Sequence, residues 1–427
     1  MNSGFIYGLR LAFPKDKIRL YAAASHIEAV KNILLHDQVF ISNIEYIPIK
    51  FSDTGSLKAF LQYIILFNKL FNQVVKLKVN KIFFLSFSPP ILFVIKKLKK
   101  RQKFSALKFS FVLHGDFENI NTKTYQMEED TTIDPVPPDS MPIDVRSFSS
   151  RVRSLTFSKV VKKICFVTER YYENTVNYCN SKITGLFEIS GLFETREALL
   201  LNHTNDYRYI ALAPYIVANA SKFIDVEKLN IHTVLLPTFF IAPKEQLNNE
   251  YPKFAIFGFG NPKILRKIAL KLIDMQLTQK YEIRVIGMAT SGLQDLPNIF
   301  CVSPGKRLPR VEMEKWADDI DIFLNLYTKN QYQLSCSNSI LEALSYIKPV
   351  FHFDNDCVNF FNHNNKPIGI CNSNIVQYVE YMADVIQNYS NYQNVFKKFR
   401  ENILLLREEY AIKNSVDDIR NAFSWQE

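Results

Sequence analysis

The chain has 427 residues, of which 47% are hydrophobic, and it carries a formal net charge of +10. These values exclude a disordered chain and predict two globular domains, each with its own core. The six cysteines include no C-x-x-C pair, which argues against a zinc site or a disulfide framework and favours a reducing, cytosolic compartment. The longest apolar run, Ile82 to Ile95, has fourteen residues and two prolines, which is too short for a membrane span.

In the first half of the chain, β-branched and aromatic runs alternate with amphipathic patterns, which is typical of parallel sheets covered by helices. The opening stretch MNSGFIYGLRLAFP indicates a loop and a helix rather than a strand. Strand patterns recur at KKICFVTER and RYIALAPYIVANASKFI, before a polar connector with prolines, so we expect a domain boundary near Pro243. The predicted strands before this point include 17–23, 81–87 and 108–118, and the predicted helices include 25–37, 56–78 and 89–102.

Charge is unevenly distributed over this half. Between Thr54 and Gly115 there are twelve Lys or Arg and no acid, and residues 96–103 (KKLKKRQK) form a dense basic run. Such a patch can attract anionic lipid headgroups, nucleic acid or a phosphorylated substrate, or it can be a solvated helix face. Nucleic acid is the least favoured partner, because no binding module accompanies the charge. Residues 127–144 carry six acids and no base, and predict a mobile loop that is a candidate lid.

The second half repeats the alternation more clearly. Its pattern predicts a further set of parallel strands with helices between them, and helices up to Phe423. The fold class is therefore α/β. The predicted strands are 253–261, 281–289, 298–304 and 320–327, and the predicted helices include 262–276 and 309–319.

The turn FGFGN between a predicted strand and a predicted helix is the first candidate site. In an open parallel sheet, ligands bind beyond the carboxyl ends of the strands, where this turn falls. Gly258 and Gly260, followed by Asn261, permit close approach of the backbone to a phosphate. Lys263 and Lys267 place cations on the helix that follows. A tight turn without a ligand is the alternative, since a lone G-x-G is weak support for a site.

Two further loops contain candidate anion-binding residues. SPGKRLPR follows another predicted strand and offers Lys306, although a plain basic loop is the simpler interpretation. In SNSILEAL, we expect Ser337, Asn338 and Ser339 to cap a helix whose first N–H groups can bind an anion. Glu342 follows on the first turn, where it either accepts hydrogen bonds from the vicinal hydroxyls of a ribose or complements the helix dipole.

The strand end FVLHGDFE is the candidate for acid–base chemistry. His114, Asp116 and Glu118 place an imidazole and two carboxylates in one loop, although a lone strand-end histidine is more often a surface residue. The stretch DDID, at 318–321, has a D-x-D spacing that can hold a divalent metal. Because these acids end a predicted helix directly before a strand, we expect no obligatory metal.

Five segments of the second half follow one another in a distinctive order: FAIFGFGNPK, YEIRVIG, NIFCVSPG, MEKWADDIDIFL and SNSILEALSYIKPVF. Over most of Lys253 to Phe353, this arrangement resembles the nucleotide-sugar-binding domain of GT-B glycosyltransferases, closest to the family 4 type. The resemblance implies two Rossmann-like domains that face a cleft. The acceptor-side domain would be 1–243, the donor-binding domain 244–405, and a final helix over 406–427 would cross back.

The resemblance also implies roles for individual residues. Glu342 would bind the nucleotide ribose, the turn 337–339 would meet the diphosphate, and Lys263 or Lys267 would neutralise the leaving group. The family 4 pattern has a second glutamate eight positions before the ribose-binding one, where this sequence has Leu334. Such folds open with a strand and a glycine-rich loop, so the helical start suggests an N-terminal sheet without its usual first strand.

We therefore expect a metal-independent glycosyltransferase without a cofactor, with His114 and Asp116 as catalytic residues. It would move a sugar from a nucleotide-diphosphate donor to a glycan or lipid-linked acceptor, in bacterial surface polysaccharide (O-antigen or capsule) biosynthesis. The expected location is the cytoplasm, with peripheral contact to an anionic membrane through 96–103. Two alternatives stay open: a catalytically silent GT-B protein that binds another enzyme or a glycan, which Leu334 favours, and a nucleotide-sugar epimerase.

Overall fold

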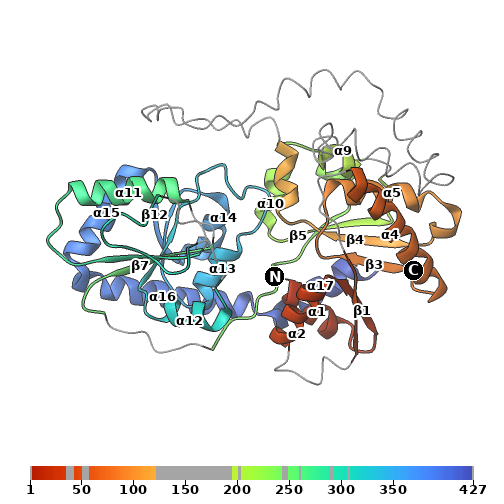
Figure 1. Ribbon diagram of the computed structural model, residues 1–427, viewed down its shortest axis with the longest axis horizontal. Helices are drawn as coiled ribbons and strands as arrows, with labels where there is room; N and C mark the ends of the chain where they lie inside the picture. Colours follow the sequence, from red (N-terminus) through yellow and green to blue (C-terminus); the bar gives the residue numbers. More distant parts are fainter. Residues whose placement is uncertain are drawn as a thin grey trace, which may run out of the picture.

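The chain folds into two lobes that lie side by side, each built on parallel sheets with helices around them (Figure 1). The predicted α/β class is confirmed. No helix in the described part of the chain is long and apolar enough to cross a membrane. The acidic segment 127–144 and Pro243 lie outside the described residues. The computed structural model describes residues 2–34, 43–50, 57–121, 195–200, 203–242, 249–258, 261–287, 292–304 and 308–425.

The second half contains a six-stranded parallel sheet in the order β12-β11-β10-β7-β8-β9. This is the strand order of a Rossmann fold, with β7 and β10 in the middle. The central strands are mostly apolar and buried along nearly their whole length, because helices cover both faces of the sheet. The strands are β7 (Lys253–Phe257), β8 (Glu282–Ile286), β9 (Ile299–Cys301), β10 (Ile322–Asn325), β11 (Val350–Phe353) and β12 (Gly369–Asn372).

Helices cover this sheet on two sides (Figure 1). On one side, α11 (Pro262–Asp274) packs against α15 (Ile375–Gln387), and the buried residues of α11 recur with helical spacing at Leu265, Ile268 and Leu272. On the other side lie α12, α13 and α16, and α13 contacts α16. The bounds of these and of the short helix after β11 are α12 (Arg310–Asp318), α13 (Asn338–Ser345), α14 (Asp356–Asn359) and α16 (Gln393–Glu409).

The first half contains two separate parallel sheets. Aromatic side chains stack across the larger one: the ring centroids of Phe84 and Phe111 are 4.9 Å apart, and those of Phe111 and Tyr209 are 5.8 Å apart. This cross-strand stacking builds the core of the lobe. The larger sheet has the order β3 (Lys81–Phe84), β4 (Lys108–Val112), β5 (Tyr207–Ala211), β6 (Ile231–Thr233), and the smaller one pairs β1 (Ile18–Ala22) with β2 (Ile44–Pro48).

The helical start predicted from the sequence is confirmed, because α1 is the first described element. The strand predicted at 17–23 is β1, and it pairs with β2 outside the larger sheet. The α-helices of this half are α1 (Asn2–Ala12), α2 (Ala24–Leu34), α4 (Leu57–Lys76), α5 (Pro89–Lys99), α9 (Thr195–Leu200) and α10 (Pro214–Ala220), and the 3₁₀ helices η1 (Gln102–Phe104), η2 (Gly115–Asn121) and η4 (Val226–Lys228) join them.

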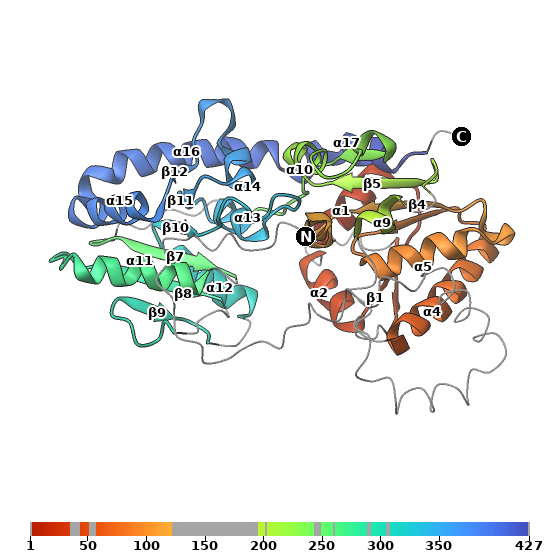
Figure 2. The ribbon, with the colours of Figure 1, turned by 90° about the horizontal axis from the view of Figure 1, so that it is seen from above.

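The end of the chain packs on the first half. From α16 the chain passes through a 3₁₀ turn into α17 (Val416–Phe423), which lies beside α1 (Figure 2). The contact is close because Gly8 has no side chain: a Cβ there would lie 2.4 Å from Cδ1 of Ile419. The rings of Phe83 and Phe423 add an edge-to-face contact with centroids 4.8 Å apart.

Only part of the basic run 96–103 is exposed, so the prediction of a basic surface patch is wrong for two of its lysines. Lys96 is 0% exposed and donates from Nζ to the carbonyl oxygen of Leu199 at 2.5 Å, with its ammonium 5.1 Å from the ring centroid of Tyr207. Lys99 is 9% exposed and pairs with Asp206 at 3.1 Å. Both side chains lie on the part of α5 that is buried together with its apolar residues. The exposed cations of the run are Lys97, Lys100, Arg101 and Lys103.

We predict that Lys96 makes folding stability depend on pH. Burial lowers the pKa of Lys96 to about 7 from its ordinary value of 10.5. The unfolded chain therefore binds one more proton between these values, and the wild type gains up to about 1.4 kcal/mol per pH unit as pH rises through this window. Denaturant unfolding at pH 7 to 10 should show this gain relative to Lys96→Met. The exposed neighbour control, Lys97→Met, should keep the wild-type slope, and equal slopes for all three proteins would contradict the prediction.

Candidate functional site

The candidate site lies where the strand order of the six-stranded sheet reverses. β7 and β10 are neighbours, but the chain leaves β7 for α11 on one face and leaves β10 for α13 on the other. Crevices at such a point, outside the carboxyl ends of the strands, are the usual ligand sites of open parallel sheets. The predicted turn after β7 and the predicted serine-rich turn before α13 therefore meet at one edge.

Glycines bring three backbone segments together at this edge. Gly258 has φ +72°, in the left-handed region that favours glycine, and a Cβ there would lie 3.0 Å from Oγ of Ser339. Gly287, which directly follows β8, would place a Cβ 1.8 Å from the carbonyl oxygen of Gly258. The hydroxyl of Ser339 donates to the carbonyl oxygen of Phe257 at 3.4 Å. The turn after β7 thus contacts both the end of β8 and the first turn of α13.

The N-cap side chain of α13 does not accept a hydrogen bond from the backbone N–H groups of the first turn. Ser337 occupies the N-cap position with extended backbone, but its side chain does not cap the helix. The predicted serine cap is therefore wrong, because the Ser337 hydroxyl is 0% exposed and hydrogen-bonds the hydroxyl of Tyr327 at 2.7 Å. Asn338 is exposed and Ser339 half-buried at the start of the helix. Uncapped N–H groups beside the Gly258 turn can bind an anion.

The helix after β7 presents two of the predicted cations. Asn261 is its N-cap, and the side-chain oxygen accepts from the backbone N–H of Ile264 at 3.2 Å. The side chain of Asn261 therefore caps the start of α11. Lys263 is exposed and Lys267 half-buried on the first turns of α11. Glu342 lies half-buried on α13.

The strand-end loop of the first half contacts the segment before α13. Glu118, in η2, accepts through Oε1 from the backbone N–H of Leu334 at 2.8 Å and from the hydroxyl of Ser335 at 2.7 Å. Burial raises the pKa of Glu118, and these two hydrogen bonds partly oppose the shift. A carboxylate from one half is thus fixed on the backbone of the other.

Helix α10 holds the same segment from a second direction. Tyr215 donates its hydroxyl to the carbonyl oxygen of Ser335 at 2.5 Å. Asn219 donates from Nδ2 to the carbonyl oxygen of Gln333 at 3.0 Å and to Oδ2 of Asp356 at 2.9 Å. Residues 333–335 are therefore held by two elements of the first half.

His114 lies four residues before Glu118 on the same loop, with an imidazole that lacks a well-formed hydrogen bond among the described residues. The ring is close to the backbone of Leu85, but the contact does not meet hydrogen-bond geometry at either nitrogen. Burial lowers the pKa of His114 to about 4. The imidazole is neutral at pH 7 and can donate one hydrogen bond and accept another.

Leu334 stands where the family 4 pattern has a glutamate, and it is 1% exposed. Its side chain belongs to the core cluster that also contains Tyr327, Cys336 and Ile340. The position is therefore apolar and packed, and its backbone N–H donates to the carboxylate of Glu118.

The remaining predicted residues either lie outside the described part of the chain or form contacts that stabilise the fold. Gly260 and Lys306 lie outside the described residues, and the side chain of Asp116 is not described. In the D-x-D stretch, Asp319 pairs with Lys253 at 2.7 Å. Asp321 accepts from the backbone N–H of Lys253 at 2.9 Å. These contacts agree with the structural interpretation of the D-x-D spacing.

Sequence reasoning missed three residues of the site. Gly287 lies inside the predicted strand YEIRVIGMA, directly after its run of apolar residues, and a glycine at that place was the available signal. Tyr215 and Asn219 are four residues apart on α10, so they share one helix face. The sequence indicates that face but not which segment it contacts.

Comparison with known proteins defines the fold. No family model matches the sequence, and no curated protein does. The structure is similar to a glycosyltransferase from Rickettsia africae ESF-5, with a TM-score of 0.53 and 10% identity, covering 97% of this chain and 92% of the other. It is equally similar to Anabaena Alr3699/HepE in complex with UDP-glucose, with a TM-score of 0.53 and 10% identity, covering 98% and 94%.

The chain therefore has the two-domain GT-B fold of glycosyltransferases, as the sequence predicted. Both similarities cover more than nine-tenths of each chain, so they include both lobes. The placement in family 4 stays a prediction.

We predict that Glu118 stabilises the contact between the two halves. Glu118→Ala leaves the buried N–H of Leu334 without its acceptor, so we expect a loss of about 1–3 kcal/mol in unfolding free energy. Glu118→Gln keeps an acceptor oxygen and should lose less. Because the folded pKa of Glu118 is raised, the stability of the wild type relative to Glu118→Gln should fall as pH rises above 4.5.

Urea unfolding at pH 4 to 7 measures both effects. Glu227→Ala, at an exposed position of η4, is the matched control and should stay within about 0.5 kcal/mol of the wild type. A loss in Glu118→Ala no larger than that of the control would show that the hydrogen bonds to Leu334 and Ser335 do not hold the halves together.

Proposed function

We propose that the chain is a glycosyltransferase that takes a sugar from a nucleoside-diphosphate donor. The observation that carries this proposal is the convergence of the Gly258 turn, Gly287 and the uncapped start of α13 at the switch point of the sheet. Such a place suits a diphosphate, because backbone N–H groups and the positive end of a helix dipole meet there. The GT-B fold supports it.

The proposed chemistry is stabilisation of a departing diphosphate. The first turn of α13 and the cations Lys263 and Lys267 neutralise the leaving group, so the protein's own charges take the role that a metal ion has in other sites. Lys306 and Gly260 are assigned to the same task from the sequence. Glu342 accepts hydrogen bonds from the ribose hydroxyls.

The acceptor is proposed to meet the donor at the loop of the first half. His114 is half-buried and neutral at pH 7, so it can orient a hydroxyl by donating or accepting a hydrogen bond. Asp116, two residues later, is the proposed base for the acceptor hydroxyl. Glu118 positions this loop through its hydrogen bonds to Leu334 and Ser335.

A second candidate function is a catalytically silent GT-B protein that binds another enzyme or a glycan. The specific observation in its favour is the packed, apolar Leu334 at the position of the family 4 glutamate. It predicts nucleotide binding without transfer, or no nucleotide binding. Measurement of donor binding separates these cases from the transferase.

We expect calorimetric titration to show binding of one nucleotide family. UDP and UDP-glucose come first, because the similar Anabaena protein is in complex with UDP-glucose, and GDP and CMP follow. Glu342→Ala and the double variant Lys263→Gln/Lys267→Gln should each weaken binding at least tenfold, about 1.4 kcal/mol.

Lys271→Gln, on the last turn of α11, is the control for the lysine variant and should bind as the wild type does. A wild type that binds no nucleotide would contradict the proposed donor site. Equal binding by all the variants would place the nucleotide elsewhere on the protein.

We further propose that the acceptor is lipid-linked, as in bacterial surface polysaccharide biosynthesis, and that the protein acts at the cytoplasmic membrane face. Support comes from one stripe of α4, where Ile65 (46% exposed) and Val75 (40% exposed) lie on the same side as Asn68. Arg101 donates to Oδ1 of Asn68 at 3.0 Å. Exposed apolar side chains beside cations suit an anionic membrane surface.

We expect the variant Lys97→Gln/Lys100→Gln/Arg101→Gln/Lys103→Gln to bind vesicles with anionic lipid at least tenfold more weakly at low salt. Each lost cation near such a surface removes about 1 kcal/mol of attraction. Vesicle co-sedimentation measures this, and Lys398→Gln, an exposed position on α16, is the single-charge control. Unchanged sedimentation would leave these residues as a solvated surface.

A further inference from the structure

A cavity of about 600 Å³ opens on the second half, away from the candidate site. Residues 249–252 line it directly before β7, and Gln279 and Lys280 line it shortly before β8. The rest of the lining comes from the end of α15, the start of α16 and the short 3₁₀ helix between them. The cavity therefore lies at the edge where the parallel strands begin, and the glycine turns of the candidate site lie at the opposite edge, where the strands end.

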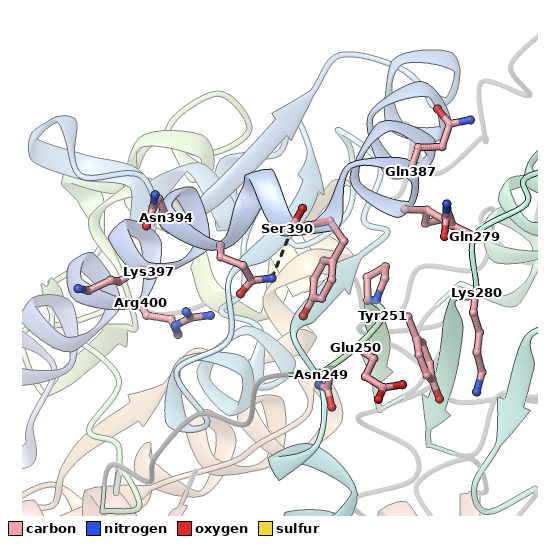
Figure 3. A pocket seen from close by; sticks show the side chains of 14 residues that line it. Asn249, Glu250, Tyr251, Gln279, Lys280, Gln387, Ser390, Asn394, Lys397 and Arg400 are labelled. Carbon is pink, nitrogen blue, oxygen red and sulfur yellow. Dashed lines mark hydrogen bonds between the residues drawn. The ribbon is translucent and has the colours of Figure 1, made fainter.

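The lining is polar and positively charged. Three cations, Lys280, Lys397 and Arg400, face a single carboxylate, that of Glu250. Lys397 and Arg400 come from α16 on one side, and Lys280 lies on the other (Figure 3). Amide groups fill much of the surface between the cations. They belong to Asn249, Gln279, Gln387, Gln393 and Asn394.

Buried contacts fix the floor of the cavity. Asp321, 7% exposed, accepts from Nδ2 of Asn249 at 3.0 Å and from the backbone N–H of Lys253 at 2.9 Å. The ammonium of Lys280 lies 4.1 Å from the ring centroid of Tyr251, which holds that cation over the ring. The groups that would meet a ligand are thus positioned in advance.

Arg400 is the least satisfied of the cations. It is half-buried, and within the described part of the chain its guanidinium forms no hydrogen bond or ion pair. Burial lowers the pKa of Arg400, and the nearby charge of Asp321 partly opposes this shift. A guanidinium that has lost water without gaining a direct partner is suited to a carboxylate or phosphate group.

We propose that this cavity binds an acidic oligosaccharide. Cations on both sides match anionic groups spaced along a chain, and the amides between them can donate to and accept from sugar hydroxyls. The volume lies within the range of about 300–1,000 Å³ that ligand sites have. A nucleotide fits less well, because Lys280 and Lys253 both lie over the ring of Tyr251 and leave it unsuited to stack on a base.

This site does not depend on the proposed donor site, since the two lie at opposite edges of one sheet. An enzyme that acts on glycans would use it to hold an acidic chain away from the reaction centre. Failure of one proposal would leave the other intact, because nucleotide titration tests the first and saccharide titration tests the second.

The test is calorimetric titration of the full chain with trigalacturonate, with neutral maltotriose and inorganic phosphate as comparison ligands. We expect trigalacturonate to bind and maltotriose not to bind. The double variant Lys397→Gln/Arg400→Gln and the single variant Lys280→Gln should weaken binding at least tenfold and at least threefold, respectively. The control Lys398→Gln, next to Lys397 but outside the cavity, should bind as the wild type does.

Four outcomes would overturn the proposal: no binding of trigalacturonate, equal binding of maltotriose, binding of phosphate alone, or the same weakening in Lys398→Gln as in the double variant. Circular dichroism melts of each variant separate lost binding from lost folding. If the double variant unfolds, Lys280→Gln decides, since Lys280 lies outside α16, in the loop before β8.

Discussion

The contact on which the two halves depend is the set of hydrogen bonds that hold residues 333–335. Glu118 binds the backbone of Leu334, Tyr215 binds that of Ser335, and Asn219 binds that of Gln333. All three bonds use main-chain groups of one segment, which leads directly into α13. A change at this junction would therefore move the start of α13 and the edge of the candidate site with it. Main-chain contacts also leave the side chain at position 334 free to be apolar, so Leu334 can pack in the core while its N–H binds a carboxylate.

The glycines of the candidate site allow backbone segments in the same region to pack closely. A diphosphate can approach backbone N–H groups only where no Cβ intervenes, and the ends of β7 and β8 are too close for one: a Cβ on Gly287 would meet the carbonyl oxygen of Gly258 at 1.8 Å. The left-handed backbone of Gly258 then directs the chain toward α11. Close strand packing and the proposed anion site thus depend on the same two residues.

Much of the architecture could be predicted from the sequence, because alternation of strands and helices is a local pattern. The turn FGFGN and the segment before α13 could be placed at strand ends for the same reason, and the structure brings Gly258 and Ser339 together. Long-range facts were not accessible. Lys96 lies in a run of charged residues that is typical of a surface, yet it is buried. Its partner, the carbonyl oxygen of Leu199, is over a hundred residues away in sequence, so the local pattern could not indicate the contact. The prediction of a serine cap was wrong for the same reason, since the hydroxyl of Ser337 forms a hydrogen bond with the hydroxyl of Tyr327.

Opposite edges of the six-stranded sheet carry different chemistry, and strand direction explains why. At the carboxyl ends, glycines and a helix start expose backbone N–H groups, which suit a compact anion. At the amino ends, helix termini and strand starts supply long side chains instead, and Asp321 holds the segment before β7 through the side chain of Asn249 and the backbone N–H of Lys253. Backbone donors are fixed by the fold, whereas lysine and arginine side chains reach across several ångströms. The first edge is therefore suited to hold a leaving group in one geometry, and the second to hold an extended acidic chain whose spacing need not be fixed.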